Sequence, residues 1–309
     1  MFRNVSRETF WKSVIYLDIL SGCDKIIRCF DRILTRCCYR NRVSEEEEET
    51  EMSLMEMLLV VCPLVFFAAF VDAIAGGGGL ISLPAYMITG MPAHMAIASN
   101  KFSAAVGTLI ATVRFIKSGN LHMKAALQTA AFALVGSVIG AKLALFLSDY
   151  YLRIAMMIIL PCVAVFVLFN RRQMGEVSRF EQLSKARIFI GMLAAGLLIG
   201  IYDGFFGPGT GTFLILAFTT VLGFDLKRAC GNTKIVNLTT NVSALVVFIL
   251  AGQVYYAVAV PAMFFSILGN WLGSGLAIKK GAKFVRPVMI FVLCLLFIKM
   301  FYDFILTAL

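Results

Sequence analysis

The sequence has little charge and few of the residue types that metal sites use. Charged residues make up only 15% of its 309 residues, against 60% hydrophobic ones, and the mean hydropathy is +0.87. These values lie outside the range of soluble globular domains and are typical of membrane proteins. Because there are two histidines and no Cys-x-x-Cys among eight cysteines, we expect no metal site and no cofactor.

Catalytic and nucleotide-binding motifs are also missing. The chain has no Gly-x-Ser-x-Gly, Walker A or His-Glu-x-x-His string, and its Gly-x-Gly pieces lack a strand–turn–helix setting. We therefore expect no enzyme. Much of the net charge of +10 lies in loops beside apolar runs, which suits orientation in a membrane and not binding to nucleic acid.

Long stretches without charge are what the sequence does have. The last of them has room for two spanning helices of about 20 residues each. The first apolar run begins near Met57 with no small-residue cleavage site after it, so we expect no cleaved signal peptide. The sequence predicts a multi-pass protein of the plasma membrane. The uncharged stretches are 73–100, 125–141, 154–170, 204–224 and 235–278.

Residues 1–51 follow a different pattern, and we predict that they form a separate N-terminal extension. From Ile19 to Cys38 apolar residues recur at helical spacing, and the opposite face carries charges. Such a helix either lies in the membrane interface or packs on the cytosolic face of the protein. Glu45–Glu49 reads as a solvated acidic linker.

The remaining chain is an internal duplication. The frame Asp-x-x-x-Gly-x-Gly begins at Asp72 and recurs at Asp203, 131 residues later. After a shift of two residues, further matches share an offset of 133. We predict a first membrane repeat over 52–170, a basic cytosolic linker over 171–187 and a second repeat over 188–309. The matches at the second offset are Lys101 with Lys234, Gly119 with Gly252, Gly136 with Gly269, Gly140 with Gly273 and Arg153 with Arg286.

Each repeat reads as a glycine-broken element followed by three helices. A straight helix over 57–90 would reach ~50 Å, too long for a ~30 Å membrane core, whereas two spans need ~40 residues. A re-entrant or interrupted helix fits this length. The predicted fold is an all-α polytopic membrane protein with two homologous four-element halves. The elements are 57–91, 95–116, 123–147 and 151–169, then 188–223, 229–250, 254–278 and 285–307.

Loop charges indicate that the two halves insert in opposite directions. Loop 117–124 holds two lysines, while its mate 250–256 has no charge; loop 148–153 is balanced, while its mate 279–286 has four bases. By the positive-inside rule this swap predicts inverted repeats. Loops 117–124 and 279–286 and the linker would be cytosolic.

The glycine-rich breaks are candidate anion sites. Backbone that breaks a helix in the membrane is tolerated only where protein or a cavity surrounds it. Glycine lets N–H groups approach a ligand, and a following helix N-terminus adds positive charge. In the second copy Thr210 and Thr212 would add hydroxyl donors. The glycines spaced four apart, such as Gly136 and Gly140, instead indicate close helix packing.

Lys101 and Lys234 would supply the positive charge that an anion needs, unless they lie at the membrane interface and snorkel. Asp72 and Asp203 would repel an anion directly. They either carry protons with the substrate or serve structurally, as ion-pair partners of Lys101 or Lys234 or as helix caps. The candidate substrate-binding residues are Gly76, Gly77, Gly78, Gly79, Asn100, Lys101, Gly207, Gly209, Thr210, Gly211, Thr212, Asn232, Thr233, Lys234, Asn237 and Asn241.

These segments resemble a known family. Residues 70–84 (FVDAIAGGGGLISLP) and 98–101 resemble the first repeat of the sulfite exporter TauE/SafE family, also called the toluene-sulfonate uptake permeases. Residues 200–213 (GIYDGFFGPGTGTF), with Asn232, Lys234 and Asn237, resemble its second repeat. The resemblance covers roughly 57–307 and implies a polytopic transporter of sulfite, sulfonates or related anions.

The expected function is a secondary transporter that moves a small anion, a sulfur oxyanion or an organosulfonate, by alternating access between the halves. Its partners would be that anion and the lipid bilayer, with proton coupling as an option. Two alternatives stay open: a small-anion channel, and a receptor or scaffold that transports nothing. The sequence assigns neither the direction of transport nor an oligomeric state.

Overall fold

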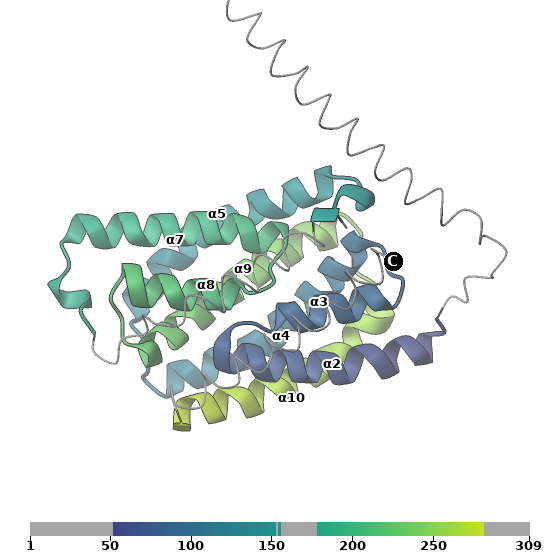
Figure 1. The fold of residues 1–309 in the computed structure, drawn as a ribbon, viewed down its shortest axis with the longest axis horizontal. Helices are drawn as coiled ribbons and strands as arrows, with labels where there is room; N and C mark the ends of the chain where they lie inside the picture. Colours follow the sequence, from purple (N-terminus) through teal and green to yellow (C-terminus); the bar gives the residue numbers. More distant parts are fainter. Residues whose placement is uncertain (1–51, 153, 156–177, 281–309) are drawn as a thin grey trace, which may run out of the picture. The chain divides into compact units, whose positions relative to one another are not determined.

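A computed structural model describes residues 52–152, 154–155 and 178–280 (Figure 1). Within these ranges the regular structure is helical, without strands. The predicted N-terminal helix and acidic linker lie outside the described residues. So do the whole of the predicted helix 285–307 and most of 151–169.

Each half begins with the predicted broken element. Among the described residues, six helices are long and apolar enough to cross a membrane, which confirms an all-α polytopic membrane protein. The first half holds α2 (Leu54–Ala75), α3 (Gly79–Ile88), α4 (Ala93–Lys117) and α5 (Met123–Phe146). The second holds α7 (Lys185–Phe205), α8 (Thr210–Leu216) with the π-helical turn η4 (Ala217–Val221), α9 (Leu226–Leu250) and α10 (Tyr256–Lys280), after a short 3-10 turn η3 (Phe180–Gln182).

The break in the first half is re-entrant. Helix α2 ends at Ala75, and the capping residue Gly76 has a φ of 78°, in the left-handed region that favours glycine. The chain then folds back so tightly that a Cβ on Gly78 would lie 2.3 Å from the Ala68 carbonyl oxygen. Helix α3 returns along α2, and its Leu83 shares an apolar cluster with Val61.

The second half repeats this hairpin. Helix α7 ends at Phe205, Gly209 has a φ of 79°, and α8 starts at Thr210. The returning segment reaches the start of α7, where a Cβ on Gly191 would lie 2.9 Å from Leu222. Both glycine-rich segments therefore turn the chain around inside the bundle.

Glycines let each half pack against the other at backbone distance. On α5, Cβ atoms at Gly136 and Gly140 would lie 2.4 and 2.0 Å from the carbonyl oxygens of Leu197 and Ile201 on α7. On α10, Cβ atoms at Gly269 and Gly273 would each lie 2.3 Å from the carbonyl oxygen of Phe66 or Phe70 on α2. The two contacts are equivalent in the two repeats. Gly269 and Gly273 correspond to Gly136 and Gly140, and Phe66 and Phe70 correspond to Leu197 and Ile201. The expected role of these glycines in close helix packing is confirmed.

The contacts are consistent with inverted repeats. In both glycine-mediated pairs the contacting residue numbers rise together, so α2 runs parallel to α10 and α7 runs parallel to α5. In the loop between α4 and α5, His122 lies beside Phe180 and Phe224. The equivalent loop between α9 and α10 lies at the other end of the bundle, where the Tyr255 amide bonds to Ser99.

One end of the bundle, here called the basic end, gathers most of the described positive charge. The opposite end carries Glu56, His94, Lys142 and Asp149. The positive-inside rule places the basic end in the cytosol, which stays a prediction. The basic end carries Arg114, Lys117, Lys124, Arg179, Lys185, Arg187, Lys227, Arg228, Lys279 and Lys280, together with Glu181 and Asp225.

Candidate functional site

Two buried ion pairs connect the halves. Lys101 on α4 lies 2.8 Å from Asp203 on α7, and their side chains are 3% and 2% exposed. Lys234 on α9 lies 3.0 Å from Asp72 on α2, with side chains 1% and 16% exposed. Lys101 and Lys234 are equivalent positions in the two repeats, and so are Asp203 and Asp72, so the two ion pairs are equivalent. Each lysine is thus held by the aspartate of the opposite repeat.

The surroundings of each pair tie it to a glycine-rich turn. Lys101 also donates to Asn241 Oδ1 at 3.1 Å, and a Cβ on Gly207 would lie only 2.9 Å from its Nζ. Lys234 also donates to the backbone carbonyl of Asp72. A residue larger than glycine at position 207 would push this pair apart.

The two glycine-rich turns contact each other directly. A Cβ on Gly76 would lie 2.3 Å from the backbone of Gly211, and the Thr212 amide donates to the Gly76 carbonyl at 3.2 Å. The Thr212 hydroxyl donates to the Ala75 carbonyl at 3.0 Å. The Thr210 hydroxyl donates to the Gly207 carbonyl at 2.7 Å. Both hydroxyls therefore stabilise the glycine-rich turns by hydrogen bonds to backbone carbonyls.

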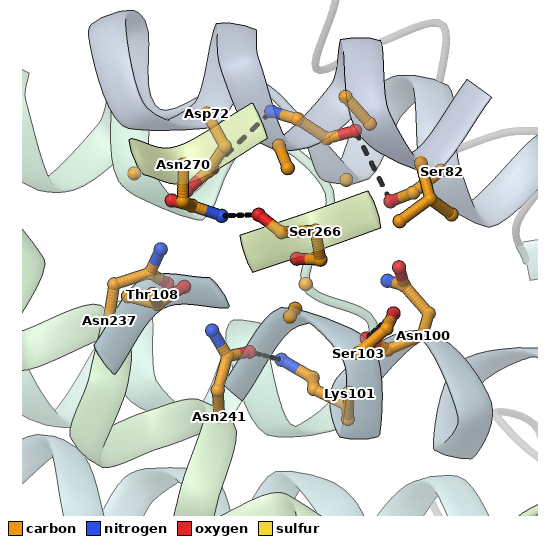
Figure 2. Close-up of a pocket in the computed structure, with 18 of the residues that line it drawn as sticks. Asp72, Ser82, Asn100, Lys101, Ser103, Thr108, Asn237, Asn241, Ser266 and Asn270 are labelled. Atoms are coloured by element: carbon orange, nitrogen blue, oxygen red, sulfur yellow. Dashed lines mark hydrogen bonds between the residues drawn. The ribbon is translucent and has the colours of Figure 1, made fainter. Parts of the chain in front are cut away.

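A polar cavity lies between α2, α3, α4, α9 and α10, at about the middle of the four spanning helices (Figure 2). Its volume is about 50 Å³, which is room for a few water molecules. Residues of both halves line it. Of the residues predicted from the sequence, the cavity wall includes Asp72, Gly76, Gly78, Gly79, Asn100, Lys101, Asp203, Gly207, Gly211, Asn237 and Asn241.

Seven predicted residues lie outside this wall. The structure places them in the glycine-rich turns or on α8 and α9, without a share in the lining of the cavity. Lys234 does not line the cavity but pairs with Asp72, which does. The Asn232 side chain accepts a hydrogen bond from the His122 amide at 2.7 Å. The seven are Gly77, Gly209, Thr210, Thr212, Asn232, Thr233 and Lys234.

Five polar lining residues were missed. Ser266 and Asn270 lie four apart on α10, within the uncharged stretch that the sequence shows, so their helical spacing on one face was a usable signal. Ser82, Ser103 and Thr108 lie on α3 and α4 among small residues and give no such signal. All five are at most 6% exposed.

The first half contributes more of the cavity wall than the second. Positions equivalent to Ala68, Ser82 and Ser103 in the other repeat hold Ile199, Phe213 and Val236. These larger apolar side chains take the place of small or polar ones. At these three positions the other repeat therefore lacks the small and polar side chains that line the cavity.

The electrostatics are those of a neutral polar site. Two lysines face two aspartates, so their formal charges cancel, and amides and hydroxyls supply the remaining polar atoms of the lining. Among the described residues, no group of three His, Cys, Asp or Glu side chains could hold a metal ion. The site can bind a small polar solute through one cation and several neutral dipoles.

Paired halves whose broken helices meet at a polar cavity, near the middle of helices long enough to span a membrane, are typical of membrane transporters. Sequence comparison identifies the family. The model of the sulfite exporter TauE/SafE family matches residues 61–300, and the chain belongs to that family of membrane transporters.

Curated relatives cover most of the chain. A probable membrane transporter protein of Haemophilus influenzae is 34% identical over 249 residues, 81% of this chain and 96% of its own length. The Escherichia coli K12 probable membrane transporter protein YfcA is 36% identical over 260 residues, 82% and 95% of the two chains. The Bacillus subtilis probable membrane transporter protein YdhB is 26% identical over 244 residues, 76% and 97%. No solved structure matches significantly.

Proposed function

We propose that the protein is a secondary transporter of a small anion, a sulfur oxyanion or an organosulfonate, that works by alternating access in the plasma membrane. The observation that carries the proposal is the cavity beside Lys101, which is buried at mid-depth and walled by both halves. An ionisable residue at this depth is a functional candidate by default, since its burial is costly. The family description as sulfite exporters supports the substrate class.

The anion competes with Asp203 for Lys101. At rest the carboxylate neutralises the ammonium group at 2.8 Å. An anion that entered without other change would leave the cavity with an uncompensated negative charge, which is expensive away from water. A proton on Asp203 removes that charge and releases Lys101 to the anion. Proton coupling then follows from the charge balance of the site.

Alternating access would use the contacts between the halves. Rocking one half against the other changes the distances across α4–α7 and α9–α2, where the two ion pairs lie. The anion-bound and empty states would therefore differ in the two ion pairs that connect the halves. The basic end faces the cytosol in this scheme.

The test is uptake into proteoliposomes of sulfite, sulfate, thiosulfate, sulfonates and carboxylates, each with and without a pH gradient. We expect saturable uptake and counterflow of at least one sulfur anion, accelerated by a proton gradient. Lys101→Ala and Lys234→Ala should each lower this flux in protein that still folds and inserts. Wild-type flux in both variants contradicts the proposed site, ohmic conductance indicates a channel, and absence of flux favours a receptor or scaffold.

A further inference from the structure

One buried polar atom on the cavity wall has no partner. Asn270 on α10 is 2% exposed, and its Nδ2 donates to the Ser266 carbonyl at 3.1 Å. Its Oδ1 makes no hydrogen bond. That donated bond fixes the orientation of the amide, because the flipped form would set two oxygens against each other. The oxygen is therefore an acceptor without a donor.

The other buried side-chain polar atoms without a hydrogen bond are not acceptors that await a ligand in the cavity wall. Among the described residues they belong to Asn232, Thr233 and Asp203. The first two do not line the cavity, and the Asp203 carboxylate faces the Lys101 ammonium at 2.8 Å. A buried acceptor without a partner costs about 1–3 kcal/mol, so such an atom in a cavity wall calls for a ligand or water to complete it.

Asn270 lies on the acceptor side of the cavity. The packing of Gly269 and Gly273 onto α2 puts this turn of α10 against the turn that holds Asp72. In Figure 2, Asn270 and Asp72 lie on one side of the cavity, and Lys101 and Asn241 lie on the other. The cavity thus has a cationic pole at Lys101 and a pole of oxygen acceptors.

The other repeat lacks this arrangement. The residue equivalent to Asn270 is Ser137, whose hydroxyl donates to the Thr240 carbonyl at 2.8 Å. Ser137 does not line the cavity. The unpartnered acceptor is therefore a property of the open cavity and not of the repeat.

We propose that Asn270 is a specificity residue that accepts a hydrogen bond from an O–H or N–H group on the transported anion. The anionic group binds at Lys101 and Asn100, and the donor at its other end bonds to Asn270 Oδ1. This inference rests on the proposed function, because it requires an anion in the cavity. An anion with a methyl group at that end leaves the acceptor unpaired and binds more weakly.

Three sulfonates of nearly equal size test the idea: 2-aminoethanesulfonate, 2-hydroxyethanesulfonate and propane-1-sulfonate. Calorimetry on the full-length protein in detergent should give at least ~10-fold tighter binding for one or both donor-bearing probes. Asn270→Leu should remove that preference and keep the affinity for propane-1-sulfonate within ~3-fold. Asn270→Ser, which installs the residue of the other repeat, should weaken the preference if the leucine variant does not fold. Ser137→Ala is the matched control and should keep it.

Equal binding of all three probes by the wild type overturns the inference, and so does a preference that survives in both Asn270 variants. Uptake of the same probes into proteoliposomes separates this result from the proposed function. Preferential binding without uptake supports the role of Asn270 and contradicts the proposal that the protein is a transporter. Uptake without preference supports the transporter and contradicts the role of Asn270. If none of the three sulfonates binds at millimolar concentration, the role of Asn270 fails, whereas the proposed function is decided by the uptake of sulfite, sulfate and thiosulfate.

Discussion

The ion pair between Lys101 and Asp203 offers the sharpest quantitative test of the site. Its side chains are 3% and 2% exposed, so removing one partner leaves a nearly buried charge without its counter-ion. Breaking such a pair costs about 3–5 kcal/mol, whereas replacing both partners by neutral groups is often nearly free. We expect Lys101→Met and Asp203→Asn each to destabilise the protein strongly and the double variant to recover most of the loss.

The mate pair supplies an internal comparison. Asp72 is 16% exposed and its Oδ1 accepts the Gly78 amide at 3.4 Å, so an unpaired Asp72 keeps some solvation. Lys234→Met should therefore cost less than Lys101→Met. A difference in this direction follows from burial, since both pairs have nearly the same length.

Thermal unfolding of purified protein in one detergent, followed by loss of folded monomer, measures these effects. Each single Lys101 or Asp203 variant should lower the unfolding midpoint clearly, and the double variant should lie close to the wild type. Coupling between the two changes should exceed ~3 kcal/mol in a double-mutant cycle. Additive effects, or singles that cost less than ~1 kcal/mol, would refute the argument that this pair is a buried and mutually dependent unit. The stable double variant should also transport no anion, because the lysine is gone.

Three further outcomes are expected. Gly140→Ala should destabilise the bundle by more than ~2 kcal/mol in thermal unfolding, because its Cβ would lie 2.0 Å from the Ile201 carbonyl oxygen; an unchanged midpoint contradicts that packing. Cysteines at Lys117 and Leu250, equivalent exposed positions in the two repeats, should react with an impermeant reagent from opposite sides of the membrane, and same-side labelling contradicts the inverted repeats. Thr212→Val removes the bond to the Ala75 carbonyl and should lower stability by about 1–2 kcal/mol without changing which sulfonate binds best, so a changed ranking would place this hydroxyl in the substrate site.

The fold could be predicted from the sequence because a membrane-spanning helix needs a long apolar segment, which is visible in the local sequence. The elements predicted from apolar segments overlap α2, α4, α5, α7, α9 and α10, and the constant offset related the two halves. The glycines at positions 136, 140, 269 and 273 could be interpreted as packing residues because their spacing of four defines one helix face. Their contacts confirm it.

The partners within the site could not be fixed in the same way. The sequence allowed each aspartate to pair with either lysine, and the choice of the opposite half depends on how the halves interlock. The same tertiary packing turns the Thr210 and Thr212 hydroxyls toward backbone carbonyls. Asn270 was missed although it lies four residues after Ser266 on one helix face, because tertiary packing decides what this face of α10 meets.

The parallel packing of α2 against α10 has a consequence for biosynthesis. The Phe66 carbonyl meets Gly269, so α2 lacks this partner until about 200 further residues have been made. At about 5–20 residues per second, that interval is roughly 10–40 s. Throughout it, the α2 surface that will receive the glycines of α10 is covered by lipid or by the insertion machinery. Assembly of the first repeat is therefore a late event, and a ribosome that stalls before α10 leaves an intermediate whose leading helix lacks its native neighbour.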